Sequence, residues 1–203
     1  MSRIISGSAR GRRIEAPAGS RTRPTTDRVR EAVFSAIGAW AGTAGEEPSR
    51  ALSGLAFLDL FAGSGAMAIE AASRGAHPVV AIDSAKPAVA VARRNAKTVG
   101  VEVDVRAQKV DTALVERSSA HDGGVTDDAF DIVWADPPYD LDPAAVDRVI
   151  RAVIDNGWLV RNGLLVIERS SRTPAPAVPE GFETWSRRYG ETTIHYAQRL
   201  GED

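Results

Sequence analysis

A short apolar segment that runs into closely spaced glycines constrains the fold of this chain more than any other feature. Residues 57–62 (Phe-Leu-Asp-Leu-Phe-Ala) lead into residues 63–65 (Gly-Ser-Gly), and a helical pattern follows over residues 66–74. Glycines at these positions let the backbone turn tightly and approach a ligand closely. A strand, a glycine turn and a helix in this order predict the first unit of a doubly wound α/β sheet, which binds ligands at the carboxyl ends of its strands.

The glycine turn is compatible with two kinds of ligand. Gly63-x-Gly65-x-x-Ala68 fits the dinucleotide-binding pattern, so NAD and S-adenosylmethionine are both candidates. Asp59 favours S-adenosylmethionine, because a methyl-donor site needs a carboxylate near the ammonium group of the donor. We therefore predict that Asp59 and the glycine turn bind the donor.

A second acid follows at the end of the next strand-like run, over residues 79–83 (Val-Val-Ala-Ile-Asp). An acid in this place can accept hydrogen bonds from both ribose hydroxyls of a bound nucleoside, which predicts that role for Asp83. The competing interpretation is an ordinary aspartate at a strand end or helix start.

The segment after the third candidate strand is predicted to pass near the adenine of the donor. It comprises residues 108–111 (Gln-Lys-Val-Asp), and we assign Val110 to the cofactor site on this basis. Lys109 stands where an acid or amide would most naturally meet the adenine amino group. Backbone groups, Gln108 and Asp111 therefore remain open as the groups that recognise adenine.

The segment Asp136-Pro137-Pro138-Tyr139 directly follows an apolar run over residues 130–135. Two acceptors beside an exocyclic amino group would draw its nitrogen towards tetrahedral geometry and free its lone pair, and the Asp136 carboxylate and the Pro137 carbonyl can supply them. The prolines hold both acceptors stiffly, and Tyr139 offers a face on which a base can stack. The segment predicts methyl transfer to a nucleobase amino group, although proline-terminated strands without function also match four residues.

The first 30 residues are strongly basic in a chain whose net charge is −2. They hold eight arginines against two acids, a formal +6, so the remainder carries −8. A basic end on an acidic body suits nucleic-acid binding, and arginine in particular forms bidentate contacts with phosphate. A GC-rich genome is the competing explanation for the arginines. The residues that we predict to bind RNA are Arg3, Arg10, Arg12, Arg13, Arg23, Arg28 and Arg30.

The remaining pattern completes a fold and a domain division. Residues 3–7 and 11–15 are predicted to form a small hairpin, and residues 23–27 to start a helix that has a threonine cap and apolar residues at helical spacing. Further along we expect a third strand over 103–106, a loop over 118–129, a helix over 142–156, a fifth strand over 163–168, and a hairpin of strands 182–188 and 192–199. This order predicts a doubly wound, Rossmann-like sheet with an antiparallel edge. The predicted divisions are an RNA-contacting extension (1–38), a connector (39–54) and a catalytic domain (55–203).

Composition excludes several classes of protein. The chain has no cysteine, so it has no disulfide and no thiolate metal site, and its three histidines are scattered without ligand spacing. It has no signal-peptide pattern and no apolar run near 18 residues. We expect a cytoplasmic monomer without a metal site or a membrane span.

Three stretches together resemble the RsmD family of bacterial methyltransferases. They are residues 3–12 (Arg-Ile-Ile-Ser-Gly to Gly-Arg), residues 23–31 (Arg-Pro-Thr-Thr-Asp-Arg-Val-Arg-Glu), and the motifs around Asp59 and Asp136. The resemblance covers residues 3 to 200, and residues 23–31 discriminate best, because the other motifs recur in many methyltransferases. It implies a class I S-adenosylmethionine-dependent methyltransferase that modifies the N2 amino group of a 16S rRNA guanine.

The resemblance also implies site residues and a partner. The glycine-turn residues that would line the methionine end of the donor are Phe61, Ala62, Gly63 and Gly65. Asp83 would hold the ribose, while Asp136, Pro137 and Tyr139 would receive the guanine. The partner would be 16S rRNA within the small ribosomal subunit or a late assembly intermediate.

Three other functions stay open from the residues alone. The Asp136 segment presents acceptors to any exocyclic amino group, so an adenine-N6 methyltransferase acting on DNA or RNA is the nearest alternative. A non-catalytic ribosome-assembly factor would use the basic end without the donor site. An NAD-dependent reductase is more distant, because the Asp136 segment has no role in hydride transfer.

Overall fold

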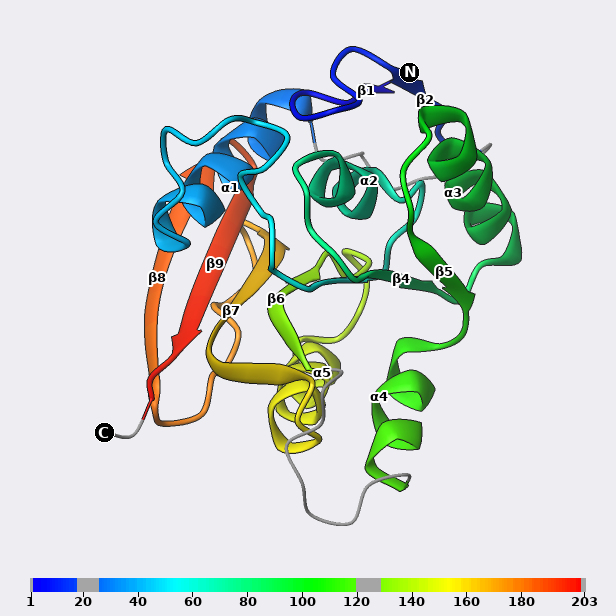
Figure 1. The fold of residues 1–203 in the computed structure, drawn as a ribbon. Helices are drawn as coiled ribbons and strands as arrows, with labels where there is room; N and C mark the ends of the chain where they lie inside the picture. Colours follow the sequence, from blue (N-terminus) through cyan, green and yellow to red (C-terminus); the bar gives the residue numbers. More distant parts are fainter. Residues whose placement is uncertain (1, 18–25, 120–128, 202–203) are drawn as a thin grey trace.

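Seven strands form the central sheet in the order β5-β4-β3-β6-β7-β9-β8, within the residues that the computed structural model describes (2–17, 26–119 and 129–201; Figure 1). The first five strands of this order run parallel, whereas β9 is antiparallel to both β7 and β8. The strands are β3 (Phe57–Leu60), β4 (Val79–Asp83), β5 (Asp104–Ala107), β6 (Phe130–Ala135), β7 (Leu159–Ser170), β8 (Phe182–Tyr189) and β9 (Thr192–Arg199). The predicted doubly wound sheet with an antiparallel hairpin is confirmed.

Helices cover both faces of this sheet (Figure 1). One face packs against α1 (Asp27–Trp40), α2 (Ala66–Ser73) and α3 (Lys86–Val99), and the other against α4 (Val110–Ser119) and α5 (Pro143–Asp155). Side chains alternate between the faces along each strand, so Trp134 joins the core under α1 while its neighbour Val133 joins the core over α5. None of these described helices combines the length and apolar character that crossing a membrane requires.

The basic N-terminal segment folds as the predicted small hairpin, in which β1 (Ser2–Arg3) pairs with β2 (Arg13–Ile14). Its apolar residues pack on α2 and α3, because Ile4, Ala9 and Ile14 are buried in one cluster with residues of those helices. Gly7 permits the close approach: its φ is +82°, and a Cβ there would lie 1.9 Å from the Ser73 carbonyl oxygen. The hairpin is therefore held against the catalytic sheet's helices by shape as well as by apolar contact.

The Glu70 carboxylate on α2 joins the hairpin to two helices. It is fully buried, and it accepts hydrogen bonds from the backbone amides of Ile5 (2.8 Å) and Ser6 (2.9 Å). The Arg74 guanidinium pairs with it at 2.9 Å and that of Arg30 at 3.7 Å. A buried charge is tolerated only when it is paired and hydrogen-bonded, so these partners define the place of the hairpin on the sheet.

The prediction that Arg30 contacts RNA is wrong. Arg30 is 1% exposed, and its guanidinium donates to Asp27 (3.0 Å), to Ser2 Oγ (3.0 Å) and to the Arg3 carbonyl oxygen. The Arg30 side chain lies next to the apolar stripe of α1 and points towards Glu70 rather than solvent, because the hairpin and α2 cover that side of the helix. The helix itself begins as predicted, with Thr26 as its N-cap.

Two elements differ from the sequence prediction. A helix, α4, lies between β5 and β6, where we expected an uninterrupted connection and, from residue 118, a loop. Its apolar stripe (Val110, Ala113 and Leu114) is too short to indicate a helix by itself, and these side chains are buried against the sheet. Strand β7 begins at Leu159 and not at residue 163, because a register shift opposite residues 130–132 lets the earlier residues pair as well. The rest of the predicted loop, residues 120–128, lies outside the described residues.

Replacement of Glu70 tests this account of the hairpin. We expect Glu70→Ala to lower the free energy of unfolding by about 3–5 kcal/mol, because it leaves the Ile5 and Ser6 amides without their acceptor and removes one of the two carboxylates that pair with the buried Arg30. Urea unfolding followed by circular dichroism measures the change. Glu31→Ala, which removes an exposed acid from α1, is the matched control and should stay within about 0.5 kcal/mol of the parent protein. Equal stability of the Glu70 variant would contradict the role given to this carboxylate.

Candidate active site

Three strands bring acidic residues together at the carboxyl edge of the sheet. Leu60 on β3 lies opposite Ala135 on β6, which in turn lies opposite Ile167 on β7. One residue further along, Asp136 directly follows β6 and Glu168 lies on the neighbouring strand β7. Both side chains project from the same face of the sheet. The predicted position of Asp136 at this edge therefore comes with a second acid beside it.

Asp59 lies one strand away, on the same face. Its side chain is 1% exposed, and it accepts a hydrogen bond of 3.0 Å from the backbone amide of Ala68, in the first turn of α2. Burial raises the pKa of Asp59 to about 8, helped by the negative charge of Asp83 and opposed by the hydrogen bond from Ala68. Asp59 can therefore hold a proton near neutral pH, and a cation placed beside it would favour its charged form.

The pKa of Asp136 is raised well above its ordinary value, and the causes are named neighbours. Burial is the largest, followed by the charges of Glu168 and Asp59, while the Arg169 guanidinium acts in the opposite direction. Glu168 and Arg169 are themselves 2% and 3% exposed. Asp136 thus lies among two acids and one base, and a donated hydrogen bond would favour its ionised form.

Glu168 and Arg169 were missed in the sequence. The signal was present, because they end the apolar run of the fifth strand as Asp83 ends that of the second, but Glu and Arg at a strand end carry no motif of their own. Arg169 also donates to the Leu141 carbonyl oxygen at 3.5 Å, which supports the loop that follows Tyr139.

The glycine turn is held in an unusual backbone conformation. Gly63 and Gly65 have φ of +54° and +75°, and Phe61, which carries a side chain, has φ of +64°. The left-handed conformation is energetically unfavourable for any residue that has a side chain, and such residues are concentrated at functional sites. Asp83 fixes the turn from β4: its Oδ2 accepts from the Gly63 amide and its Oδ1 from the Ala85 amide, both at 2.8 Å.

The predicted donor residues border unfilled space. A Cβ on Gly63 would meet no atom within 4 Å, so open space lies in front of the turn, whereas a Cβ on Gly65 would lie 3.1 Å from that of Ala92. The Gln108 amide donates to the Asp83 carbonyl oxygen at 3.0 Å, which brings the 108–110 segment next to the ribose candidate. The side chain of Val110 is buried between α4 and the sheet, so of this residue only the backbone could meet a ligand.

The Asp136 segment presents its residues differently. Pro137 is buried, whereas Tyr139 is 41% exposed. The Asp136 amide donates to the Leu60 carbonyl oxygen at 3.4 Å, which ties the start of the segment to the strand that precedes the glycine turn. The structure thus brings the candidate catalytic and donor residues to one edge. Their roles stay predictions.

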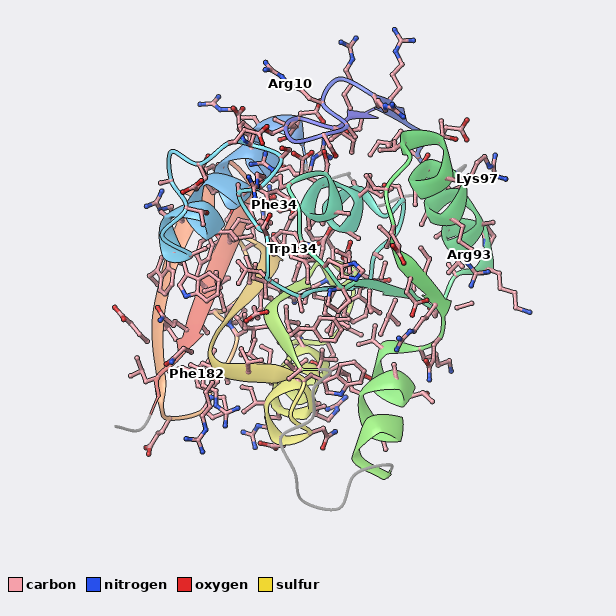
Figure 2. The ribbon with its side chains drawn as sticks, in the orientation of Figure 1. Arg10, Phe34, Arg93, Lys97, Trp134 and Phe182 are labelled. Atoms are coloured by element: carbon pink, nitrogen blue, oxygen red, sulfur yellow. The ribbon has the colours of Figure 1, made fainter. Side chains whose placement is uncertain are left out.

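Most of the predicted RNA-binding arginines lie on the outer side of the hairpin and α1. Arg3, Arg10, Arg12, Arg13 and Arg28 are exposed, and Figure 2 shows Arg10 on the hairpin far from the core residues Phe34 and Trp134. Arg12 is partly committed to α3, since it donates to the Val99 carbonyl oxygen at 2.7 Å. Arg23 lies outside the described residues. Among those that are described, no cluster of His, Asp and Glu side chains could hold a metal ion.

Comparisons with known proteins identify the family of this chain. The family described as conserved hypothetical protein 95 matches residues 2–198. YlbH of Bacillus subtilis, a proposed rRNA methyltransferase, is 30% identical over 98% of this chain and all of its own. Ribosomal RNA small subunit methyltransferase D of Escherichia coli is 30% identical over 98% of this chain and 88% of its own.

A solved structure is similar over nearly the whole chain. A proposed methyltransferase of Escherichia coli, yhhF, superimposes with a TM-score of 0.77 at 29% identity, over 98% of each chain. Its extent includes the N-terminal hairpin as well as the sheet, so the likeness is not confined to the common donor-binding core. The chain belongs to the RsmD/YlbH family of S-adenosylmethionine-dependent methyltransferases, and it has the class I fold.

Proposed function

We propose that this protein transfers a methyl group to the N2 amino group of a guanine in the 16S rRNA of the small ribosomal subunit. The observation that carries the proposal is Asp136 with its stiff Pro-Pro-Tyr continuation, set among buried acids and next to the glycine turn. The choice of guanine and of 16S rRNA rests on the family and on the relatives named for small-subunit rRNA methylation.

On the donor side, S-adenosylmethionine supplies an electrophilic methyl group on a sulfonium. The residues of this chain that would hold it are the backbone of 61–65, which surrounds the methionine end, and Asp83, whose carboxylate would accept from the ribose hydroxyls. Asp59, buried behind the turn, would face the ammonium group.

On the acceptor side, the task of the chain is to make a poor nucleophile reactive. The amino nitrogen of a base shares its lone pair with the ring. The Asp136 carboxylate and the Pro137 carbonyl would each accept one of its N–H groups, which directs the lone pair towards the methyl group. Tyr139 would hold the unstacked base by its ring face, a contact that contributes about 1–3 kcal/mol.

The proton balance requires no strong base. A nitrogen–carbon bond forms while the carbon–sulfur bond breaks, and positive charge develops on the nitrogen. One of its protons becomes acidic and would pass along its hydrogen bond to the ionised Asp136 carboxylate, a weak base that then releases it to solvent. Arg169 opposes the raised pKa of Asp136, and the N–H donated by the bound base would act in the same direction, so both favour the ionised carboxylate.

A labelled-methyl assay tests the proposal directly. Small subunits from a strain that lacks this enzyme, incubated with the purified protein and labelled S-adenosylmethionine, should acquire label that digestion recovers as N2-methylguanine. Asp136→Ala should lose at least a hundredfold in turnover while binding S-adenosylhomocysteine nearly as well, because it removes an acceptor and no donor contact. Recovery of N6-methyladenine would give the function to an adenine methyltransferase. No label with the parent protein would favour an assembly factor.

The raised pKa of Asp59 predicts how donor affinity depends on pH. In the free protein Asp59 is largely protonated below about pH 8, and an ammonium group beside it would favour its ionised form. Binding would then release a proton, so affinity for S-adenosylhomocysteine should increase from pH 6 to pH 7.5, by up to about tenfold per pH unit. The range stays below pH 8 because α-amino groups lose their own proton near there.

Isothermal titration calorimetry in buffers of different ionisation enthalpy counts the released proton. Asp59→Asn is the matched control: it keeps the size of the side chain and should bind the ligand with an affinity that is flat over the same pH range. The same pH dependence in both proteins would separate Asp59 from the ammonium group.

The exposed arginines predict a salt-dependent contact with RNA. Arg10→Ala combined with Arg13→Ala should weaken binding to 16S rRNA and make the slope of log affinity against log salt shallower by about 1 for each arginine. Filter binding at several salt concentrations measures this slope. Arg148→Ala combined with Arg151→Ala removes the same charge from the exposed side of α5 and should leave the slope unchanged. If the Arg10/Arg13 double variant had an unchanged salt slope, a GC-rich genome would be the better explanation for these arginines.

A further inference from the structure

Asn95 on α3 connects two segments that the sequence analysis treated separately. Its side chain is 3% exposed, and all three of its hydrogen bonds are 2.9 Å long. Oδ1 accepts from the Glu15 amide, and Nδ2 donates to the Glu15 carbonyl oxygen, as a neighbouring strand would. Nδ2 also donates to the carbonyl oxygen of Ser64, the central residue of the glycine turn.

The glycine turn depends on such outside contacts. Two glycines with positive φ give it many alternative conformations, so the donor-binding conformation must be imposed by its surroundings. The Gly63 amide is fixed by Asp83, and the Gly65 amide donates to the Ala62 carbonyl oxygen at 2.7 Å within the turn. Asn95 supplies the contact at the residue between them.

The other end of the Asn95 link belongs to the basic hairpin. Glu15 comes directly after β2, two residues from Arg13 and three from Arg12, whose guanidinium donates to the Val99 carbonyl oxygen. A force on these arginines from bound phosphate therefore acts on the strand that Asn95 holds. Since the same amide group holds Ser64, a change in the position of Glu15 is passed to the donor turn through one side chain.

We propose that Asn95 is a positioning residue that makes RNA binding on the hairpin and donor binding at the glycine turn favour each other. The proposal rests on the proposed function, because it requires both ligands. RNA that orders residues 10–15 would fix Asn95 and with it the Ser64 carbonyl, so the donor meets a turn that is already in place. Linkage requires the reverse effect to be equal, so a bound donor would strengthen RNA binding by the same factor.

Filter binding of labelled small subunits, with and without saturating S-adenosylhomocysteine, measures this factor. In the parent protein the ligand should strengthen subunit binding about fivefold or more. In Asn95→Ala the factor should fall to about one, whereas Arg94→Ala should retain it. Arg94 is the control because it is the neighbouring residue on α3 and contacts Glu15 only through an exposed ion pair of 3.3 Å.

Two further measurements keep the outcome clear. Asn95→Asp preserves the size of the side chain and the acceptor for the Glu15 amide but removes both donated hydrogen bonds, so it should lose the factor even if the alanine variant folds poorly. In the free protein, hydrogen–deuterium exchange should accelerate together at residues 13–16 and 63–66 in either Asn95 variant, and not in Arg94→Ala.

The results separate this inference from the proposed function. A parent protein that binds neither S-adenosylhomocysteine nor small subunits would refute the function itself. Binding of both ligands without mutual strengthening would overturn the inference and leave the function standing. The inference would also be overturned if the Asn95 variants kept the full factor, or if exchange accelerated at only one of the two segments.

Discussion

The buried carboxylate of Glu70 holds the N-terminal segment to the rest of the molecule. A charge removed from water needs partners on every side, and Glu70 has them in two hairpin amides and two guanidinium groups. Because Glu70 lies on α2, the helix that follows the glycine turn, the support of the hairpin and that of the donor site are the same helix. The basic hairpin is thus packed against the helices of the sheet and is not a separate unit.

The acids at the sheet edge create a different constraint. Burial opposes the ionisation of Asp59 and of Asp136, and the charges of Glu168 and Asp59 oppose that of Asp136 further. A site of this kind favours ligands that carry positive charge or N–H groups. A sulfonium amino acid and a base amino group have these properties, and the raised pKa values are therefore consistent with the chemistry proposed for the edge.

Much of the fold and of the candidate site could be predicted from the sequence, because the signals for them lie in residues that are adjacent along the chain. The glycine turn, Asp83 at a strand end and Asp136 before two prolines are local signals, and a parallel sheet brings strand ends together. Arg30, α4 and Asn95 could not be predicted in this way. Arg30 is buried by segments distant in sequence, the apolar stripe of α4 is too short to stand out, and Asn95 matters only because Glu15 and Ser64 meet beside it.

The attachment of the hairpin also bears on the order in which the chain folds. Ile5 meets Glu70 across 65 residues, Glu15 meets Asn95 across 80, and Arg12 meets Val99 across 87. The hairpin residues therefore gain their first partners when α2 has been synthesised and the rest only when α3 is complete. Closing loops of this length differs little in entropy from closing shorter ones, so the delay is kinetic. A nascent chain that stopped before residue 95 would have the strand and the glycines of the donor turn, but not the amide that holds them.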